Sequence, residues 1–282
     1  TYEKKHELNI GAEIGFIDNR INIEADWYTR NNFDLIGLIY TKGTGGQLAK
    51  FANVASMKSS GVEFTVSTRN IKTKDFSWNT DFIFSHTKNE VTDLQSNASV
   101  MDMISGNGFA MEGYPVRALF SMDFQGLNEN GYPTFINEKG QLTVSDINFQ
   151  EQLKKDHLVY EGPTDPTMTG SLGNIFRYKG FTLNAFITYS FGNVIRLDPV
   201  FHNVYSDLDA MPREFINRWT TGGDEKVTNV PVIADKRANQ QDPYLSYAYN
   251  AYNYSTERIA KGDFIRMKEL SLSYNFPKKM IS

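Results

Sequence analysis

The chain has 282 residues, of which 29 are basic and 33 acidic, and its net charge of −4 gives no field that would attract nucleic acid. It contains no cysteine, which excludes a disulfide scaffold and a cysteine-ligated metal site. The mean hydropathy is −0.44 and no run of 18 apolar residues occurs, so no transmembrane helix is predicted. These values do not exclude a membrane β-barrel, because every second residue of its strands faces water.

Seven segments alternate apolar and polar residues, as a strand with two unlike faces requires. In chain order they cover residues 6–16, 20–30, 61–71, 76–94, 167–178, 181–192 and 264–276. The last segment stops before Pro277, and its irregular start, DFIRMKE, predicts a bulge. The sequence therefore predicts an all-β fold made of antiparallel strands.

The connections between these segments alternate in length. The first, third and fifth are tight turns, at Asp18–Asn19, at residues 72–75 and at Lys179–Gly180. The second is a predicted loop of about twenty residues that contains GTGG, and the fourth and sixth are long irregular stretches, roughly 95–166 and 193–261. All tight turns thus share one end of the sheet, which is the plan of an outer-membrane barrel with short periplasmic turns and long extracellular loops.

Aromatic and basic residues gather at the short-turn end. The aromatic set is Phe16, Phe76, Trp78, Tyr178, Phe181 and Phe276. The basic set beside the turns is Arg20, Lys72, Lys74, Lys179, Lys278 and Lys279. Rings flanked by charge mark a membrane interface, so we interpret the aromatic set as lipid-facing girdle residues.

The face opposite the apolar stripes is small or polar, which suits a wide, wet lumen. Its acidic members are Glu13, Glu24, Asp26, Glu63 and Asp81. We expect them to hydrate the lumen rather than to form a catalytic set. The four histidines show no paired metal spacing, so no metal, cofactor or enzymatic activity is expected.

Five segments resemble the SusC/RagA family of TonB-dependent outer-membrane transporters, and they occur in that family's order. They are KSSGVEFTVSTRN…DFSWNTDFIF within 58–94, EGYPVRALFSMDFQGLNENGYPTF at 112–135, DPTMTGSLGNIFRYKGFTLNAFITYSFGN at 165–193, RWTTGGDEKVTNVP at 218–231 and KGDFIRMKELSLSYNFPKK at 261–279. The resemblance implies a barrel of about 22 strands with a plug in its lumen. It also implies that residues 1–282 are part of the barrel domain, and that the plug and the barrel's C-terminus are absent from this chain.

The resemblance further implies the function and the partners. We expect the outer membrane as the location and TonB-dependent import of an oligosaccharide or peptide as the activity. The partners would be a SusD-like lipoprotein, TonB (through the absent N-terminal part) and outer-membrane lipid. Two alternatives stay open: a soluble secreted β-protein, either carbohydrate-binding or a glycoside hydrolase, and a passive porin.

Contacts with ligand or lipoprotein are expected in the long loops, where binding residues concentrate. The segment YLSYAYNAYNY at 244–254 is rich in tyrosine, whose ring and hydroxyl suit sugar, peptide and protein contacts. The candidates are Tyr132, Phe135, Trp219, Tyr244, Tyr247, Tyr249, Tyr252 and Tyr254. For each of them, packing inside the loops is the competing interpretation.

Overall fold

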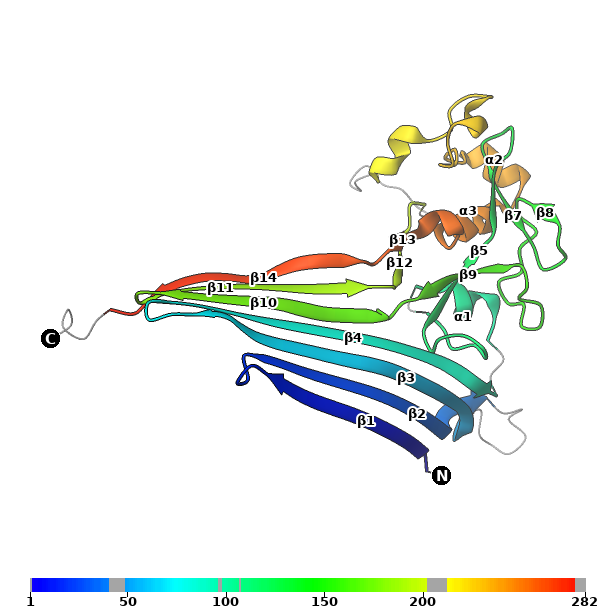
Figure 1. Cartoon of the computed structure of the whole chain (residues 1–282). Coiled ribbons are helices and arrows are strands. Elements are labelled where there is room, and N and C mark those ends of the chain that lie inside the picture. The colour runs from blue at the N-terminus through cyan, green and yellow to red at the C-terminus, as the bar shows by residue number, and fades with distance from the viewer. Residues whose placement is uncertain (1, 41–48, 96–97, 107, 202–211, 277–282) are drawn as a thin grey trace.

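The computed structural model describes residues 2–40, 49–95, 98–106, 108–201 and 212–276. Seven long strands in this part of the chain form one antiparallel sheet (Figure 1). In spatial order they are β1 (Lys4–Phe16), β2 (Ile21–Tyr40), β3 (Ala49–Lys72), β4 (Phe76–Leu94), β10 (Met168–Tyr178), β11 (Phe181–Phe191) and β14 (Phe264–Tyr274). The seven predicted strands are confirmed, and β1 and β14 leave two open edges, as a piece of barrel wall would.

The turns at one end of the sheet are tight because their residues adopt left-handed backbone conformations. Ile17, Asp18 and Asn19 have φ of 54°, 52° and 58° between β1 and β2. Lys179 and Gly180 have φ of 45° and 89°, so the β10–β11 link is a two-residue turn whose twist matches the strands. The predicted bulge in the last strand is also confirmed, since the β11–β14 register shifts between Phe186 and Ile187.

The predicted twenty-residue loop after the second strand is wrong. β2 continues to Tyr40 and β3 begins at Ala49, and the two strands stay paired past β1 and β4. The β2–β3 register shifts beside Asp34, which has a φ of 57°. The alternation of apolar and polar residues breaks there, so the sequence pattern does not reveal the rest of the strand. The GTGG motif at 43–46 lies outside the described residues, as do His202, Lys278 and Lys279.

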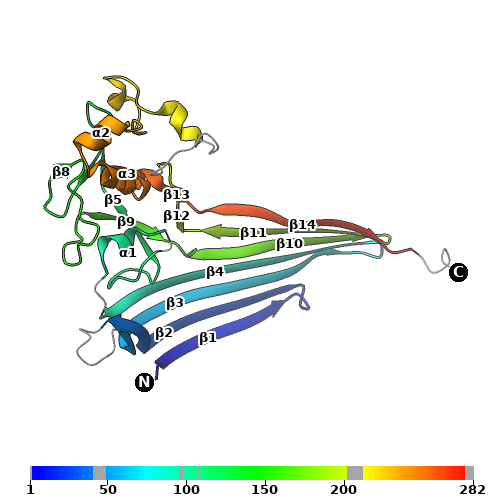
Figure 2. The same ribbon diagram turned by 180° about the vertical axis from the view of Figure 1, so that it is seen from behind.

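The described residues of the two long connections at the other end fold together into what we call the loop domain, residues 95, 98–106, 108–167, 192–201 and 212–263. Figures 1 and 2 show it gathered at one end of the sheet, with the short turns and the end of β14 at the other. Its first half contains α1 (Val100–Ile104), β5 (Ala118–Met122), β6 (Phe124–Leu127), β7 (Pro133–Ile136), β8 (Leu142–Thr143) and β9 (Leu158–Pro163). Its second half contains β12 (Val194–Arg196), η1 (Arg213–Asn217), η2 (Asp224–Lys226), α2 (Lys236–Gln241), α3 (Leu245–Asn253), η3 (Thr256–Arg258) and β13 (Ile259–Lys261).

The loop domain holds the main hydrophobic core among the described residues, so the prediction of irregular loops there is wrong. Its buried cluster is Val100, Ile104, Met122, Phe135, Ile147, Val200, Phe201, Phe215, Ala251 and Tyr252. These residues come from both long connections, which therefore fold as one unit. None of the described helices is long and apolar enough to cross a membrane.

Candidate functional site

One face of the sheet is apolar from edge to edge. The register places one apolar side chain of each strand in a single row: Ile14, Ile23, Val66, Phe82, Leu172, Ile187 and Met267. Towards the edges these side chains are open, and Leu272 is 69% exposed. A soluble sandwich would cover such a face with a second apolar layer, whereas lipid covers it in a barrel.

The height of this face fits a bilayer. On β4 it runs from Phe76 to His86, which is eleven residues and ten steps along the strand. At about 3.4 Å per residue and a strand tilt of about 40°, this length spans about 26 Å along the membrane normal. The apolar band of outer-membrane barrels is about 25 Å tall, so these strands are long enough to cross it without any other element.

The predicted girdle residues lie together at the short-turn end of this face. Phe76, Tyr178, Phe181 and Tyr274 are in register on four neighbouring strands, and the rings of Phe181 and Tyr274 are 4.5 Å apart. Trp78 stacks on Phe176 one position further in, with centroids 5.5 Å apart. Phe16 ends β1, and the ring of Phe276 lies 5.0 Å from that of Tyr274. Rings gathered at one height of a sheet are typical of an interfacial aromatic girdle, and the girdle role of these residues stays a prediction.

Four polar side chains near the girdle end of the apolar face are hydrogen-bonded to one another: Asn70, Trp78, Thr80 and Asn174. Asn174 Oδ1 accepts from Trp78 Nε1 at 2.9 Å and from Thr80 Oγ1 at 2.7 Å. Asn70 Nδ2 donates to Thr80 Oγ1 at 2.7 Å. Such pairing is required where no water is available, because an unpaired polar group in hydrocarbon costs several kcal/mol.

The predicted lumen-facing acids do share the opposite face. Glu13 lies opposite Glu24, and Asp26 lies opposite Glu63. Asp81 accepts a hydrogen bond from Ser67 Oγ at 2.7 Å. Like charges placed opposite one another repel, so this face suits water or a cationic neighbour. Within the described residues no group of three or more histidines and acids is placed to hold a metal.

The loop domain is fixed to the sheet by the EGYPV segment. β10 pairs with β4 only as far as His86, so β10 leaves the edge of the remaining residues of β4, up to Leu94, uncovered. Gly113 N donates to Val91 O and Val91 N donates to Tyr114 O, both at 2.9 Å. Val116 N donates to Asn89 Oδ1 at 2.8 Å. The EGYPV segment therefore covers the edge of β4 and satisfies its backbone groups there.

Two arginines, Arg258 buried and Arg196 half-buried, hold the inside of the loop domain together. The Arg196 guanidinium donates to Phe120 O at 2.6 Å and to Ser255 O at 3.2 Å, and burial lowers its pKa to about 10. Arg258 donates to Asp198 O at 2.6 Å. Both join segments far apart in the sequence by bonding to backbone oxygens. Sequence reasoning missed them, because nothing in the residues around them signals burial.

The tyrosine-rich segment is mostly the helix α3, which the sequence analysis had treated as loop. Tyr252 is 3% exposed, burial raises its pKa, and its ring contacts Phe124 and Phe201. Tyr249 Oη donates to Val232 O at 2.6 Å, and the Arg196 guanidinium lies over Tyr254. These three tyrosines pack inside the loop domain, as does Phe135, which is fully buried.

Tyr244 and Tyr247 are different, because they remain open to solvent. They are 61% and 44% exposed, and their ring centroids are 5.8 Å apart. The Tyr247 ring also meets Phe149 edge-on at 5.9 Å. The result is an exposed aromatic pair on a folded support, a surface of the kind that binds sugars, peptides or proteins.

Trp219 and Tyr132, from two motifs far apart in sequence, come together. The Trp219 ring packs on Gly131, where an added Cβ would lie 2.5 Å from it, and Gly131 also needs its φ of 76°. Trp219 Nε1 donates to Glu225 Oε2 at 3.1 Å. Trp219 thereby anchors its own loop on the turn beside Tyr132, and Tyr132 is half-buried.

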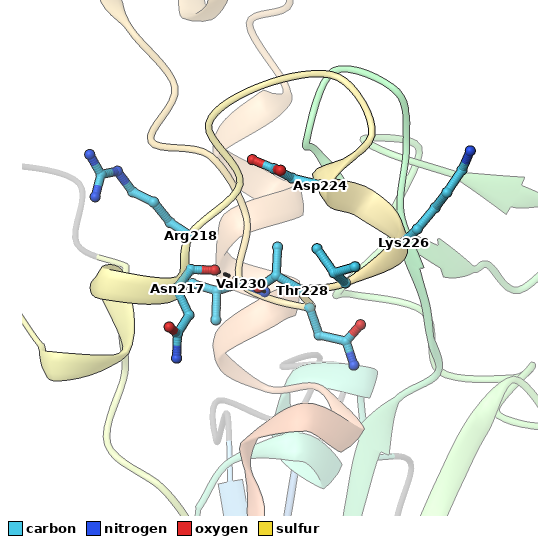
Figure 3. Close-up of a pocket in the computed structure, with 8 residues that line it drawn as sticks. Asn217, Arg218, Asp224, Lys226, Thr228 and Val230 are labelled. Atoms are coloured by element: carbon cyan, nitrogen blue, oxygen red, sulfur yellow. Dashed lines mark hydrogen bonds between the residues drawn. The ribbon is translucent and has the colours of Figure 1, made fainter.

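An open pocket of about 580 Å³ lies in this loop (Figure 3). It is lined by Asn217, Arg218, Asp224, Lys226, Val227, Thr228, Asn229 and Val230. Asp224 accepts from the Thr220 and Thr221 amides, which hold the pKa of its carboxyl below the ordinary range. Arg218 and Lys226 point in opposite directions. The Asp224 carboxylate is therefore hydrogen-bonded within its own loop, and the two cationic side chains point away from each other. The charged groups do not converge on one ligand position.

The sheet geometry agrees with the proteins that the chain resembles in sequence, which are TonB-dependent receptors. Over 99% of its length it is 23% identical to TonB-dependent receptor P3 of Formosa agariphila, of which it covers 28%. It is 27% identical to TonB-dependent receptor SusC of Bacteroides thetaiotaomicron over 74% of the chain and 22% of the receptor. The chain resembles SusC and its relatives. No family model matches it.

The fold comparison gives the same answer. The structure superposes on the RagAB peptide transporter with a TM-score of 0.73 and 21% identity, covering 99% of this chain and 29% of that one. The sheet is thus part of the wall of an outer-membrane β-barrel, and the predicted fold class and location are confirmed. The chain spans less than a third of the length of these relatives.

Proposed function

We propose that the protein imports a bulky nutrient, an oligosaccharide or a peptide, across the outer membrane with energy delivered through TonB. One observation carries the proposal: a sheet with one apolar face bears, at one end of its strands, a folded loop domain with exposed aromatic side chains. Relatives of matching architecture include a receptor named SusC and a transporter of peptides.

The loop domain is the proposed meeting place for ligand and partner. Its exposed Tyr244 is the N-cap of α3 and Tyr247 lies in the first turn of that helix, whose other face is buried, so both are presented on a rigid element. A SusD-like lipoprotein covering the extracellular opening would meet this surface first. The plug and the TonB-contacting segment would be supplied by parts of the protein outside residues 1–282.

The test is uptake by cells that carry the full native protein, measured with labelled peptides and labelled oligosaccharides in separate arms. Active import predicts that uptake of one class is lost when TonB is deleted or the proton gradient is collapsed. Uptake that persists in both conditions would indicate a passive porin. A full native protein that is soluble without detergent would overturn the membrane function altogether.

The binding surface has its own test. Replacing both exposed tyrosines, Tyr244→Ala with Tyr247→Ala, should weaken binding of ligand or lipoprotein at least tenfold, because aromatic anchors carry most interface energy. The control is Leu153→Ala, which changes an exposed apolar residue elsewhere in the loop domain. Equal binding by both variants would remove the tyrosine pair from the proposed surface.

A further inference from the structure

A pocket of about 310 Å³ lies at the short-turn end, between the β3–β4 and β10–β11 turns. Its lining is Lys72, Thr73, Lys74, Asp75, Phe76, Ser77, Arg177, Tyr178, Lys179, Gly180, Phe181, Thr182 and Asn275. The walls are tied to each other, since Lys179 N donates to Asp75 O at 3.2 Å and Asn275 N donates to Gly180 O at 2.9 Å. The pocket is therefore held by backbone hydrogen bonds and does not depend on mobile side chains alone.

The pocket is strongly basic. Four of its lining residues are cationic (Lys72, Lys74, Arg177 and Lys179) and one is acidic, Asp75. Within the part of the chain that the structure describes, none of the four cations forms an ion pair. Four neighbouring cations repel one another, and an anion placed among them would relieve that repulsion.

The pocket also adjoins the apolar face. Phe76, Tyr178 and Phe181 line it and stand in register as part of the girdle. The row behind them, Ser77, Arg177 and Thr182, lies on the polar face. The cations at the edge beside the rings are therefore those of the two turns, Lys74 and Lys179. A ligand seated here meets these two cations at its head and the rings along its tail.

We propose that this pocket binds the phosphate headgroup of an anionic phospholipid, whose acyl chains lie along the girdle. The amphipathic lining favours a lipid over free phosphate, because free phosphate would use the cations and leave the rings without a partner. The proposal rests on the membrane placement of the sheet and is independent of what the protein transports.

The test compares lipid retention by the full native protein and a double variant, Lys74→Gln with Lys179→Asn. Asparagine suits position 179, since it tolerates the positive φ there better than most residues. The matched control is Arg69→Gln, which removes an exposed charge at the same end of the sheet from outside the pocket. All proteins are titrated with phosphatidylglycerol and with phosphatidylcholine in mixed micelles, and bound lipid is read by native mass spectrometry.

The expected result is tight retention of phosphatidylglycerol over phosphatidylcholine by the native protein. Each cation near an anionic headgroup contributes about fivefold in affinity, so the double variant should bind phosphatidylglycerol roughly 30-fold more weakly. The Arg69→Gln control should stay within about twofold of the native protein, since its charge is outside the pocket.

Three results would overturn the proposal. Equal retention of the two lipids would show that the headgroup charge is not recognised. Equal weakening by the double variant and the Arg69→Gln control, per charge removed, would show a diffuse field without a pocket. Displacement of the lipid by inorganic phosphate at low millimolar concentration would show that free phosphate is the ligand.

Discussion

Placing one arginine on each face of β3 tests which face meets lipid. Val66 lies on the apolar face between Ile23 and Phe82 in the register, and its neighbour Thr65 lies on the opposite face, across from Glu24. The variants Val66→Arg and Thr65→Arg therefore add the same side chain at nearly the same height in the membrane but on opposite faces of the wall.

The expected loss of folding free energy depends on how deep position 66 lies in the membrane. Phe82, beside Val66, lies six residues from the girdle residue Phe76. That distance is about 20 Å along the strand and about 16 Å along the normal, close to the middle of a band about 26 Å tall. An arginine there costs about 2–4 kcal/mol on the lipid face, a factor of about 30 to 900 in the folding equilibrium. Thr65→Arg should cost less than about 1 kcal/mol, because its charge faces water and Glu24.

The assay is equilibrium unfolding of the full native protein in lipid vesicles, followed by tryptophan fluorescence against guanidinium concentration. The expected outcome is a much lower midpoint for Val66→Arg than for Thr65→Arg, with similar slopes. Equal midpoints, or a lower one for Thr65→Arg, would refute the assignment of the apolar face to lipid.

Three further predictions concern other parts of the chain. Gly170→Ala places a Cβ 2.1 Å from the Ile83 carbonyl and should destabilise the barrel by about 1–3 kcal/mol, whereas Gly222→Ala, with open space around it, should stay within about 0.5 kcal/mol in the same unfolding assay. Ser99→Ala removes the capping box of α1 and should cost about 1 kcal/mol, seen as faster amide exchange in that helix; unchanged exchange would contradict the cap's role. The hydrogen bonds that lower the pKa of Asp224 favour its ionised carboxylate, so they stabilise the loop at neutral pH. This stabilisation should be lost as the pH falls through the folded-state pKa of Asp224, and amide exchange in the loop should become faster. Asp224→Asn should show the same faster exchange already at pH 7.

The strands were predictable because lipid and water impose a strict two-residue period on them. That period located the seven strands and the tight turns, and the bulge in β14 was predicted from the point where the period fails. The same logic explains why β2 and β3 were both predicted too short. Asp34 inserts a left-handed residue into β2, so the pattern beyond it changes phase and reads as loop.

The loop domain was not predictable, because its core is assembled from contacts between distant segments. Phe135 and Phe215 pack in one cluster although 80 positions separate them, and no local period reports such contacts. α3 did carry a signal that the aromatic count obscured. Leu245, Ala248 and Tyr252 are buried and spaced by three and four residues, as one face of a helix requires.

The candidate binding residues show the same division. Composition alone selected five tyrosines between 244 and 254, but composition cannot separate a ring that packs from a ring that is presented. The fold separates them, with Tyr252 buried and Tyr244 exposed. The acidic residues share one face of the sheet, as strand parity predicts, and their contact with a lumen stays a prediction.

The most direct test of the central claim is a nitroxide scan along β11 in the full native protein, reconstituted in lipid vesicles. Collision rates with oxygen, which concentrates in lipid, and with a water-soluble nickel chelate are measured at each position. The account predicts high oxygen access at Leu183, Ala185 and Ile187 and high nickel access at Asn184 and Thr188, which point to the other face. Low access to both reagents at Leu183, Ala185 and Ile187 would mean that protein covers the apolar face, and it would contradict the membrane wall.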